Sequence, residues 1–328
     1  MNVFLTFDYE LFFGSKSGSI QKCIIEPTEK LIEISKKHNV FFTFFVDAGF
    51  LVSLKLNIGK FPHLQNEYDS VCNNIQRLES EGHSIQLHIH PHWEKSYYDG
   101  QKWVFNVDGC YALSDFSDDM IEKIVLNYKN ELQSIIKEPI SSFRAGGLAV
   151  QPFSKIRAAL LDNEILIDSS VLNLCYKKTA SYQFDFRTSP NKGRYSFNKD
   201  VCKEEKGDFW EFPIAGWKYS RFFYWKLYLL GYFFPSKHKF IGDGNYVPTP
   251  NEKKIKLFKS RHDNVSCDGY YTSALKKIFE NYNRKNRSDI VVLGHPKSQT
   301  IFSLNKLDQT IGKTKNKYQY KTFKESIK

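Results

Sequence analysis

The chain has 328 residues, 41% of them hydrophobic and 25% charged, which is the balance of a globular protein with a sizeable core. Its formal net charge of +11 favours anionic partners such as a phospholipid surface or a phosphorylated glycan, and no nucleic-acid motif accompanies it, so we expect no nucleic-acid partner. The six cysteines are scattered without a Cys-x-x-Cys pair, which excludes a zinc-finger spacing and a disulfide-stapled small domain.

Strand and helix signals alternate along the chain. Short apolar runs rich in β-forming residues predict strands, and apolar residues three or four positions apart predict helices. Strands are predicted at residues 2–7, 40–46, 84–87, 142–145, 165–167, 209–214 and 289–293, and helices at 27–37, 67–80, 119–136, 154–161 and 271–282. This alternation favours a parallel α/β sheet or barrel that forms one domain over residues 1–328.

Three segments interrupt the alternation. Residues 94–117 are expected to form a loop or small hairpin turning at Asp99-Gly100, and residues 216–270 are an irregular insertion. Residues 298–328 form a C-terminal elaboration in which 318–323 are a candidate for a last strand. Within the second insertion, the basic and aromatic residues 219–234 fit a helix packed on the barrel, or a helix lying in a membrane interface.

The histidines cluster at the end of the third predicted strand. His83, His88, His90 and His92 lie within ten residues of one another. If a turn begins at His88, then His88 and His92 are four residues apart and converge on one ion, since neutral imidazole is the usual ligand for zinc and related metals. The alternative is a solvated histidine-rich loop. We interpret the cluster as a metal site, with His83 and His90 as supporting or structural residues.

Other polar residues fall at the ends of further strands, where α/β barrels place their active sites. Asp8 and Glu10 end the first strand, Arg144 lies in the fourth, and His295 follows the last. Two histidines and a carboxylate leave open positions on a metal for a water molecule, whose pKa the ion lowers. A second carboxylate can then take a proton, a separate histidine can protonate the leaving group, and an arginine can hold the carboxylate ionised.

This set resembles the polysaccharide deacetylase family, carbohydrate esterase family 4, whose domain is a distorted (β/α)7 barrel. The resemblance covers residues 3 to about 297. The matching segments, in family order, are Thr6-Phe7-Asp8-Tyr9-Glu10, the pair His88 and His92, Phe143-Arg144-Ala145-Gly146-Gly147, Trp210-Glu211-Phe212-Pro213 and Val292-Leu293-Gly294-His295.

The resemblance implies metal-dependent removal of an acetyl group from an N-acetylated sugar. It implies that Asp8 is the general base, that His88 and His92 bind the metal, that His295 is the general acid and that Arg144 tethers Asp8. The metal-binding aspartate of the family is Tyr9 here, so we assign Glu10 as the third ligand, because residues two apart in a strand share a face. The implied metal is a divalent ion, with zinc expected.

The remaining candidate residues concern the substrate. Trp93 and Trp210 are assigned to the substrate pocket, and a backbone amide at Gly146 or Gly147 is assigned to oxyanion stabilisation. Asp168 either tunes His295 or caps a turn at Ser169-Ser170.

The expected function is deacetylation of a sugar in a glycan precursor for surface polysaccharide, with a substrate that is lipid-linked or nucleotide-linked. Because acidic residues follow the first apolar run at once, we expect no signal peptide and a cytoplasmic protein, with peripheral contact at the inner membrane face through residues 219–234. Three alternatives remain: hydrolysis of another non-peptide C–N bond, a glycan-binding pseudoenzyme without metal, and a membrane-docking scaffold.

Overall fold

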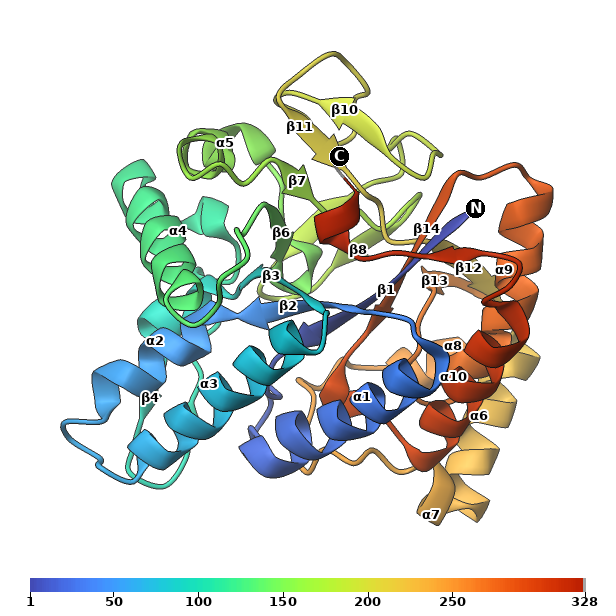
Figure 1. Cartoon of the computed structure of the whole chain (residues 1–328), viewed down its shortest axis with the longest axis horizontal. Coiled ribbons are helices and arrows are strands. Elements are labelled where there is room, and N and C mark those ends of the chain that lie inside the picture. Colours follow the sequence, from blue (N-terminus) through green and yellow to red (C-terminus); the bar gives the residue numbers. More distant parts are fainter. Residues whose placement is uncertain (327–328) are drawn as a thin grey trace.

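A curled, mostly parallel β-sheet organises the chain (Figure 1). The structure, a computed structural model, describes residues 1–326. Eight strands follow one another in the order β10-β11-β7-β6-β3-β2-β1-β14, and β15 pairs with the first half of β1. All neighbours are parallel except β10 and β11. The strands are β1 (Asn2–Tyr9), β2 (Thr43–Asp47), β3 (Ser84–Ile89), β6 (Ser142–Ala145), β7 (Ile167–Asp168), β10 (Tyr195–Phe197), β11 (Phe209–Glu211), β14 (Asp289–Gly294) and β15 (Gln319–Tyr320).

The sheet closes into a distorted barrel through isolated β-bridges and not through a continuous ladder of paired residues. Ile214, just after β11, pairs in parallel with Val291 of β14, and the amide of Ala215 donates to the carbonyl of Val291 at 2.9 Å. Ser266 bridges to Leu293 in the same way. Because the strands are parallel, their carboxyl ends meet at one end of the barrel.

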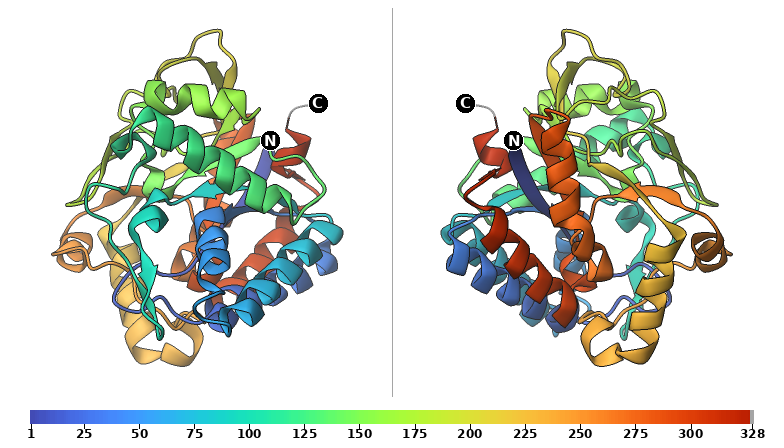
Figure 2. Two further views of the ribbon diagram at one scale, coloured as in Figure 1. Left: turned by 90° about the vertical axis from the view of Figure 1, so that its left-hand side faces the viewer. Right: turned by 90° about the vertical axis from the view of Figure 1, so that its right-hand side faces the viewer.

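Helices pack around the outer side of the curled sheet (Figures 1 and 2). They bury an apolar stripe against it, as Ile121, Ile124, Val125 and Leu132 do on α4. The helices are α1 (Glu26–His38), α2 (Ala48–Asn57), α3 (Leu64–Ser80), α4 (Asp118–Gln133), α5 (Phe153–Asp162), α9 (Leu275–Arg284) and α10 (Ile301–Thr314).

Three two-stranded ribbons and three more helices lie outside the barrel and its surrounding helices. The ribbons pair β4 (Tyr97–Tyr98) with β5 (Trp103–Val104), β8 (Tyr176–Lys178) with β9 (Gln183–Asp185), and β12 (Gly216–Tyr219) with β13 (Arg261–Asn264). Between β12 and β13 the chain forms α6 (Arg221–Phe233), α7 (Pro235–His238) and α8 (Glu252–Phe258). Among the described residues, no helix combines the length and the apolar character needed to cross a bilayer.

The predicted fold class, an α/β barrel of distorted type, is confirmed, and so is the hairpin within residues 94–117. Of the helices packed around the barrel, two were not predicted. In α2, apolar residues on several sides of the helix are buried, so the sequence shows no amphipathic stripe. In α10, three threonines and serines obscure an apolar stripe that includes Leu304, Leu307 and Ile311. The predicted helix at 271–282 begins only at Leu275, after a 3₁₀ turn over Gly269–Ala274.

Candidate active site

Asp8 and Arg144 form a buried ion pair at the centre of the barrel end. The Arg144 guanidinium donates from Nη1 to Oδ1 of Asp8 at 2.6 Å. It also donates to the carbonyl of Ser169 at 2.9 Å and to the hydroxyl of Ser169 at 3.0 Å, and it stacks 4.1 Å from the centroid of the Phe45 ring. Arg144 is fully buried, so these contacts fix its position. The predicted contact with Asp8 is therefore present.

Glu10, His88 and His90 bring their ligand atoms within 4.8 Å of one another. Nε2 of His88 lies 3.2 Å from Oε2 of Glu10, and Nε2 of His90 lies 2.7 Å from the same oxygen. Nδ1 of His88 donates to the carbonyl of Arg144 at 2.8 Å, which leaves Nε2 facing the other two residues. Glu10 and His88 thus meet as predicted, but the third member is His90.

His92, which was predicted to be a ligand, does not belong to the group formed by Glu10, His88 and His90. The backbone is extended at His90, so His88 and His90 share a face as alternate residues of a strand do. His92 lies within the following 3₁₀ turn, Pro91–Lys95, and its Nδ1 faces the hydroxyl of Ser96 at 3.4 Å. His88 and His92 could converge on one ion only if a turn began at His88, whereas the observed turn begins three residues later, at Pro91. Burial, reinforced by His90, holds the pKa of His92 well below its usual range, so this ring is neutral.

A buried lysine completes the surroundings of Glu10. Lys297 is 1% exposed, and its Nζ donates to Oε1 of Glu10 at 2.8 Å and to the carbonyl of Leu11 at 2.6 Å. The ammonium also lies 5.0 Å from the Phe12 ring and 5.1 Å from the Phe13 ring. Burial would raise the pKa of Glu10, but Lys297 and the histidines outweigh it and hold that pKa well below its usual range.

The charge on Glu10 and Asp8 also acts on His88. Burial alone would lower the pKa of His88, yet the two carboxylates raise it to about 9. A metal ion binding at Nε2 therefore has to displace a proton, which makes metal affinity fall as the pH falls.

His295 is paired with Asp268, a residue that lies in none of the sequence motifs. Nδ1 of His295 lies 2.7 Å from Oδ2 of Asp268, and the backbone amide of His295 donates to Oδ1 of Asp268 at 2.8 Å. Burial lowers the pKa of His295, but Asp268 and then Asp8 outweigh it, so that the pKa is raised. Nε2 of His295 faces Oδ2 of Asp8 at 3.9 Å, so this nitrogen points across the site toward the predicted base.

Two roles were predicted for Asp168, and the structure does not show the first of them, the tuning of His295. The register partner of Asp168 on the neighbouring strand is Glu211, and Oδ2 of Asp168 and Oε2 of Glu211 are both buried without a hydrogen-bond donor among the described residues. We call these two residues the buried carboxyl pair. Burial raises the pKa of Asp168 to about 6 and that of Glu211 well above its usual range, so burial favours a proton shared between the two carboxyl groups. The hydroxyl of Ser170 donates to Asp168, which is the turn contact of the alternative prediction.

Neither predicted tryptophan faces the candidate site. Trp93 is buried, donates from Nε1 to Oδ2 of Asp47 at 2.7 Å, and packs edge-on against Trp103 with ring centroids 5.0 Å apart. Trp210 lies next to Glu211 in β11, so the alternation of the strand turns it away from the carboxyl pair toward the opposite face, where it is 40% exposed. Both residues were assigned from their position beside motifs, which does not fix the direction of a side chain.

The two glycines after Arg144 make room for the rings of the site. A Cβ atom on Gly146 would lie 2.5 Å from Nδ1 of His90, and one on Gly147 would lie 2.6 Å from the Tyr111 ring. Gly147 also has a φ of +57°, a conformation that favours glycine. The role of either amide in oxyanion stabilisation stays a prediction. Phe13 covers His90 from the other side with ring centroids 4.4 Å apart.

The donor set fits a divalent metal such as zinc. One carboxylate and two imidazoles, all buried, match the ligand number and type of hydrolytic zinc sites, which keep one position for water. Both ring nitrogens of His90 are buried without a hydrogen-bond partner among the described residues, and the 2.7 Å contact of its Nε2 with Glu10 lacks hydrogen-bond geometry. A buried ring nitrogen without a partner is costly, and a bound cation removes that cost.

Comparisons with known proteins place similar structures in one family. No family model matches the chain, and no curated protein sequence does. Three similar solved structures are a presumed polysaccharide deacetylase from Mycobacterium smegmatis (14% identity, TM-score 0.47, 97% of this chain and 85% of that one), a family 4 acetyl xylan esterase from Clostridium thermocellum with a cobalt ion (16%, 0.43, 99% and 89%), and a CE4 family pseudoenzyme from Bacillus anthracis (13%, 0.42, 98% and 64%). They carry the name of the family that the sequence motifs resemble. At these identities and TM-scores, the function has to be inferred from the site itself.

Proposed function

We propose that this protein is a metal-dependent deacetylase that removes an acetyl group from an N-acetylated sugar. The observation that carries the proposal is the convergence of the candidate groups in one buried cluster. Oδ2 of Asp8 lies 3.8 Å from Nε2 of His88 and 3.9 Å from Nε2 of His295, and Nε2 of His295 lies 3.7 Å from Oε1 of Glu10. A base, a metal-ligand set and an acid within one buried cluster are the groups that amide hydrolysis requires.

Each residue has a defined task in this mechanism. Glu10, His88 and His90 would hold the ion, which when bound polarises the acetyl carbonyl and lowers the pKa of a water molecule. Oδ2 of Asp8, free of the Arg144 contact, accepts the proton of the attacking water, and the hydrogen bond from Arg144 to Oδ1 orients that carboxylate. His295, held protonated by Asp268, donates a proton from Nε2 to the departing amine.

The substrate that we propose is a sugar of a cytoplasmic glycan precursor for a surface polysaccharide. The net charge of +11 supports this choice, because a carrier that bears phosphate is attracted to a basic protein.

A second candidate is a glycan-binding protein without catalysis. One observation favours it: the Lys297 ammonium already neutralises Glu10 without a metal ion. A cation supplied by the chain itself can stabilise the buried carboxylate in a protein that has no metal. The two candidates differ in whether a metal binds beside Lys297.

Metal analysis of the purified protein, together with acetate release from N-acetylated sugars, tests the proposal. We expect one zinc ion per chain in the wild type, no zinc in His90→Ala, and retained zinc in His92→Ala, which serves as the matched histidine control. Asp8→Asn should keep its metal and lose roughly 10²- to 10⁴-fold in acetate release, the contribution of a general base. Absence of metal after reconstitution would refute the deacetylase and leave the binding protein. Metal without acetate release would keep the site but exclude this substrate class.

A further inference from the structure

The exposed apolar side chains of the molecule gather in one segment. Within residues 1–326, nineteen large apolar side chains are exposed, and eleven of them lie in residues 218–261, which contain α6, α7 and α8. They include Phe222 and Phe233, each 64% exposed, Tyr232 at 79% and Phe258 at 67%. Tyr224 is the one buried residue of α6. A helix that turns most of its aromatic residues outward is unusual in a soluble domain, which rarely exposes large contiguous apolar patches.

The same segment carries most of the excess charge. Residues 218–261 contain ten Lys and Arg against two Asp and Glu, a net charge of +8 out of +11 for the chain. Nine of the ten basic side chains are exposed, and none of these nine forms an ion pair within residues 1–326. The exception is Lys256, which pairs with Glu252 at 2.6 Å. We call the exposed side chains of residues 218–261 the basic aromatic face.

Several contacts show that this face is an ordered surface. Nε1 of Trp225 on α6 donates to the carbonyl of Leu257 on α8 at 3.0 Å, and the Phe223 ring packs 5.1 Å from the Tyr270 ring. The hydroxyl of Ser220 caps the first turn of α6. In Figures 1 and 2, α6 and α8 lie at the outer side of the molecule, on the opposite side from α4.

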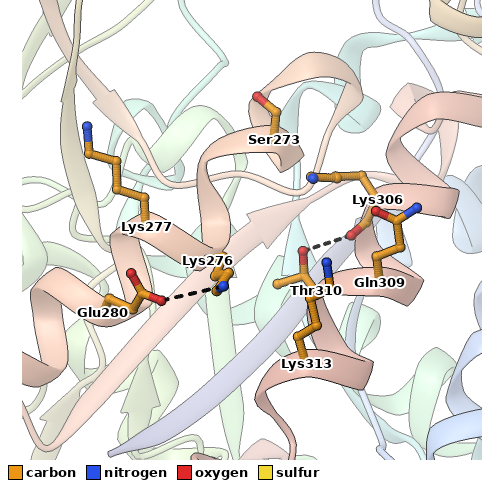
Figure 3. Close-up of a pocket in the computed structure, with 8 residues that line it drawn as sticks. All are labelled: Ser273, Lys276, Lys277, Glu280, Lys306, Gln309, Thr310 and Lys313. Carbon is orange, nitrogen blue, oxygen red and sulfur yellow. Dashed lines mark hydrogen bonds and ion pairs between the residues drawn. The ribbon is translucent and has the colours of Figure 1, made fainter.

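Positive charge continues beyond the face onto α10 and α9. His238 of α7 packs against Phe302 of α10 with ring centroids 4.6 Å apart, and a hollow beside them is lined by Lys237 and Lys306. An adjoining hollow, shown in Figure 3, shares Lys306 and lies between α9 and α10. Its other lysines are Lys276, Lys277 and Lys313, of which Lys276 approaches Glu280 at 3.9 Å.

We propose that the basic aromatic face docks on an anionic phospholipid membrane. Two independent features of the face fit that partner. Lysine and arginine are attracted to lipid phosphate, and phenylalanine, tyrosine and tryptophan enter the zone between headgroups and acyl chains. A nucleic acid would use the charge but leave Phe222, Phe233 and Phe258 in water, and a second copy of this chain would bring an equal positive charge against the face.

Docking would hold the candidate active site close to the bilayer. Within the segment that carries the face, residues 240–246 run along the residues that follow His295. The amide of Ile241 donates to the carbonyl of Gln299 at 2.8 Å, and the amide of Gly242 donates to the carbonyl of Lys297 at 3.2 Å. The Tyr246 ring lies 5.5 Å from the Lys297 ammonium, which binds Glu10. The proposal stands on the surface alone and does not require the deacetylase activity.

Co-flotation of the full-length protein with vesicles tests the proposal. We expect binding to vesicles of phosphatidylcholine with phosphatidylglycerol, weaker binding to phosphatidylcholine alone, and weakening by added salt. Lys253→Glu/Lys254→Glu should weaken binding roughly 30-fold or more, from about 1 kcal/mol for each basic residue near the surface. The matched control is Lys123→Glu/Lys137→Glu, which changes the charge equally outside the face and should bind more tightly than the Lys253/Lys254 variant.

A second variant separates lipid insertion from charge attraction. Phe222→Ser/Phe233→Ser keeps every charge and should lose at least tenfold in vesicle binding, whereas Leu56→Ser, a 78% exposed leucine on α2, should bind like the wild type. Three results would overturn the proposal. They are no preference for anionic vesicles, equal loss in the phenylalanine variant and the leucine control, and conversion of a wild-type dimer to monomer by the phenylalanine variant in sedimentation velocity. Duplex DNA binding that depends on Lys253 and Lys254 but not on the phenylalanines would assign the face to nucleic acid instead.

Discussion

Lys297→Met removes the cation that the chain itself supplies to Glu10. Nζ of Lys297 makes two hydrogen bonds, at 2.8 Å to Oε1 of Glu10 and at 2.6 Å to the carbonyl of Leu11, in surroundings where the side chain is 1% exposed. Removing one partner of such a pair leaves the other charge buried and uncompensated, at a cost of about 3–5 kcal/mol. We therefore expect the free energy of unfolding of the metal-free protein to fall by that amount.

Zinc should restore part of this loss. An ion held by Glu10, His88 and His90 provides the positive charge that the variant lacks, so the variant is expected to bind zinc more tightly than the wild type does. Ligand at a hundred times its dissociation constant stabilises a folded protein by about 2.7 kcal/mol. The difference in unfolding free energy between the two proteins should therefore shrink when zinc replaces a chelator.

Urea unfolding, followed by tryptophan fluorescence with a chelator and then with zinc, measures both effects. Lys313→Met is the control, because Lys313 is exposed on α10 and its loss should change stability by no more than about 0.5 kcal/mol. A loss of less than about 1 kcal/mol for Lys297→Met in chelator would refute the claim that Lys297 balances a buried charge. A difference that zinc does not reduce would show that the ion does not bind at Glu10.

Three further substitutions probe the surroundings of the site. Gly146→Ala places a Cβ 2.5 Å from Nδ1 of His90, so we expect zinc affinity, measured by competition with a chelating dye, to fall roughly 10- to 100-fold with all ligands retained; unchanged affinity would contradict a role for His90. Asp268→Asn removes the charge that raises the pKa of His295, so the alkaline limb of the pH–rate profile should move to lower pH, and an unmoved limb would exclude His295 as the acid. In the buried carboxyl pair the raised pKa values mean that the folded state keeps protons that the unfolded chain releases, so stability falls as the pH rises through about 6. Glu211→Gln should flatten that fall in urea unfolding between about pH 5 and pH 8, and a fall as steep as in the wild type would refute the shared proton.

The fold was accessible from the sequence because its strands are buried on both faces. The strands β1, β2 and β14 appear as short, almost continuous apolar runs, which is typical of a parallel sheet. Asp8, Arg144 and His295 could be placed at strand ends for the same reason. The location of Glu10 followed from the two-residue repeat of a strand.

The predictions fail where the direction of the backbone, or a contact between residues far apart in the sequence, determines which side chains meet. Whether His90 or His92 joins Glu10 depends on where the strand stops and the 3₁₀ turn begins, and Pro91 marks that boundary only approximately. Lys297 meets Glu10 across 287 positions of sequence and Asp268 meets His295 across 27, so neither belongs to a local pattern. The one available signal was that Lys297 follows His295 by two residues, the same spacing that links Asp8 with Glu10.

The position of β1 between β2 and β14 has a consequence for how the site assembles. The pairing of β1 with β14, and the Lys297–Glu10 contact across 287 positions of sequence, require the closure of a very long loop, which is slow and comes after local contacts have formed. The strands β1, β2 and β3, which are neighbours, bring Glu10, His88 and His90 together within the first ninety residues. A chain that grows from its amino end can therefore gather Glu10, His88 and His90 before the segment with His295 is synthesised. Binding of an ion to these three residues would then not have to wait for the proposed proton donor, because the two are encoded at opposite ends of the chain.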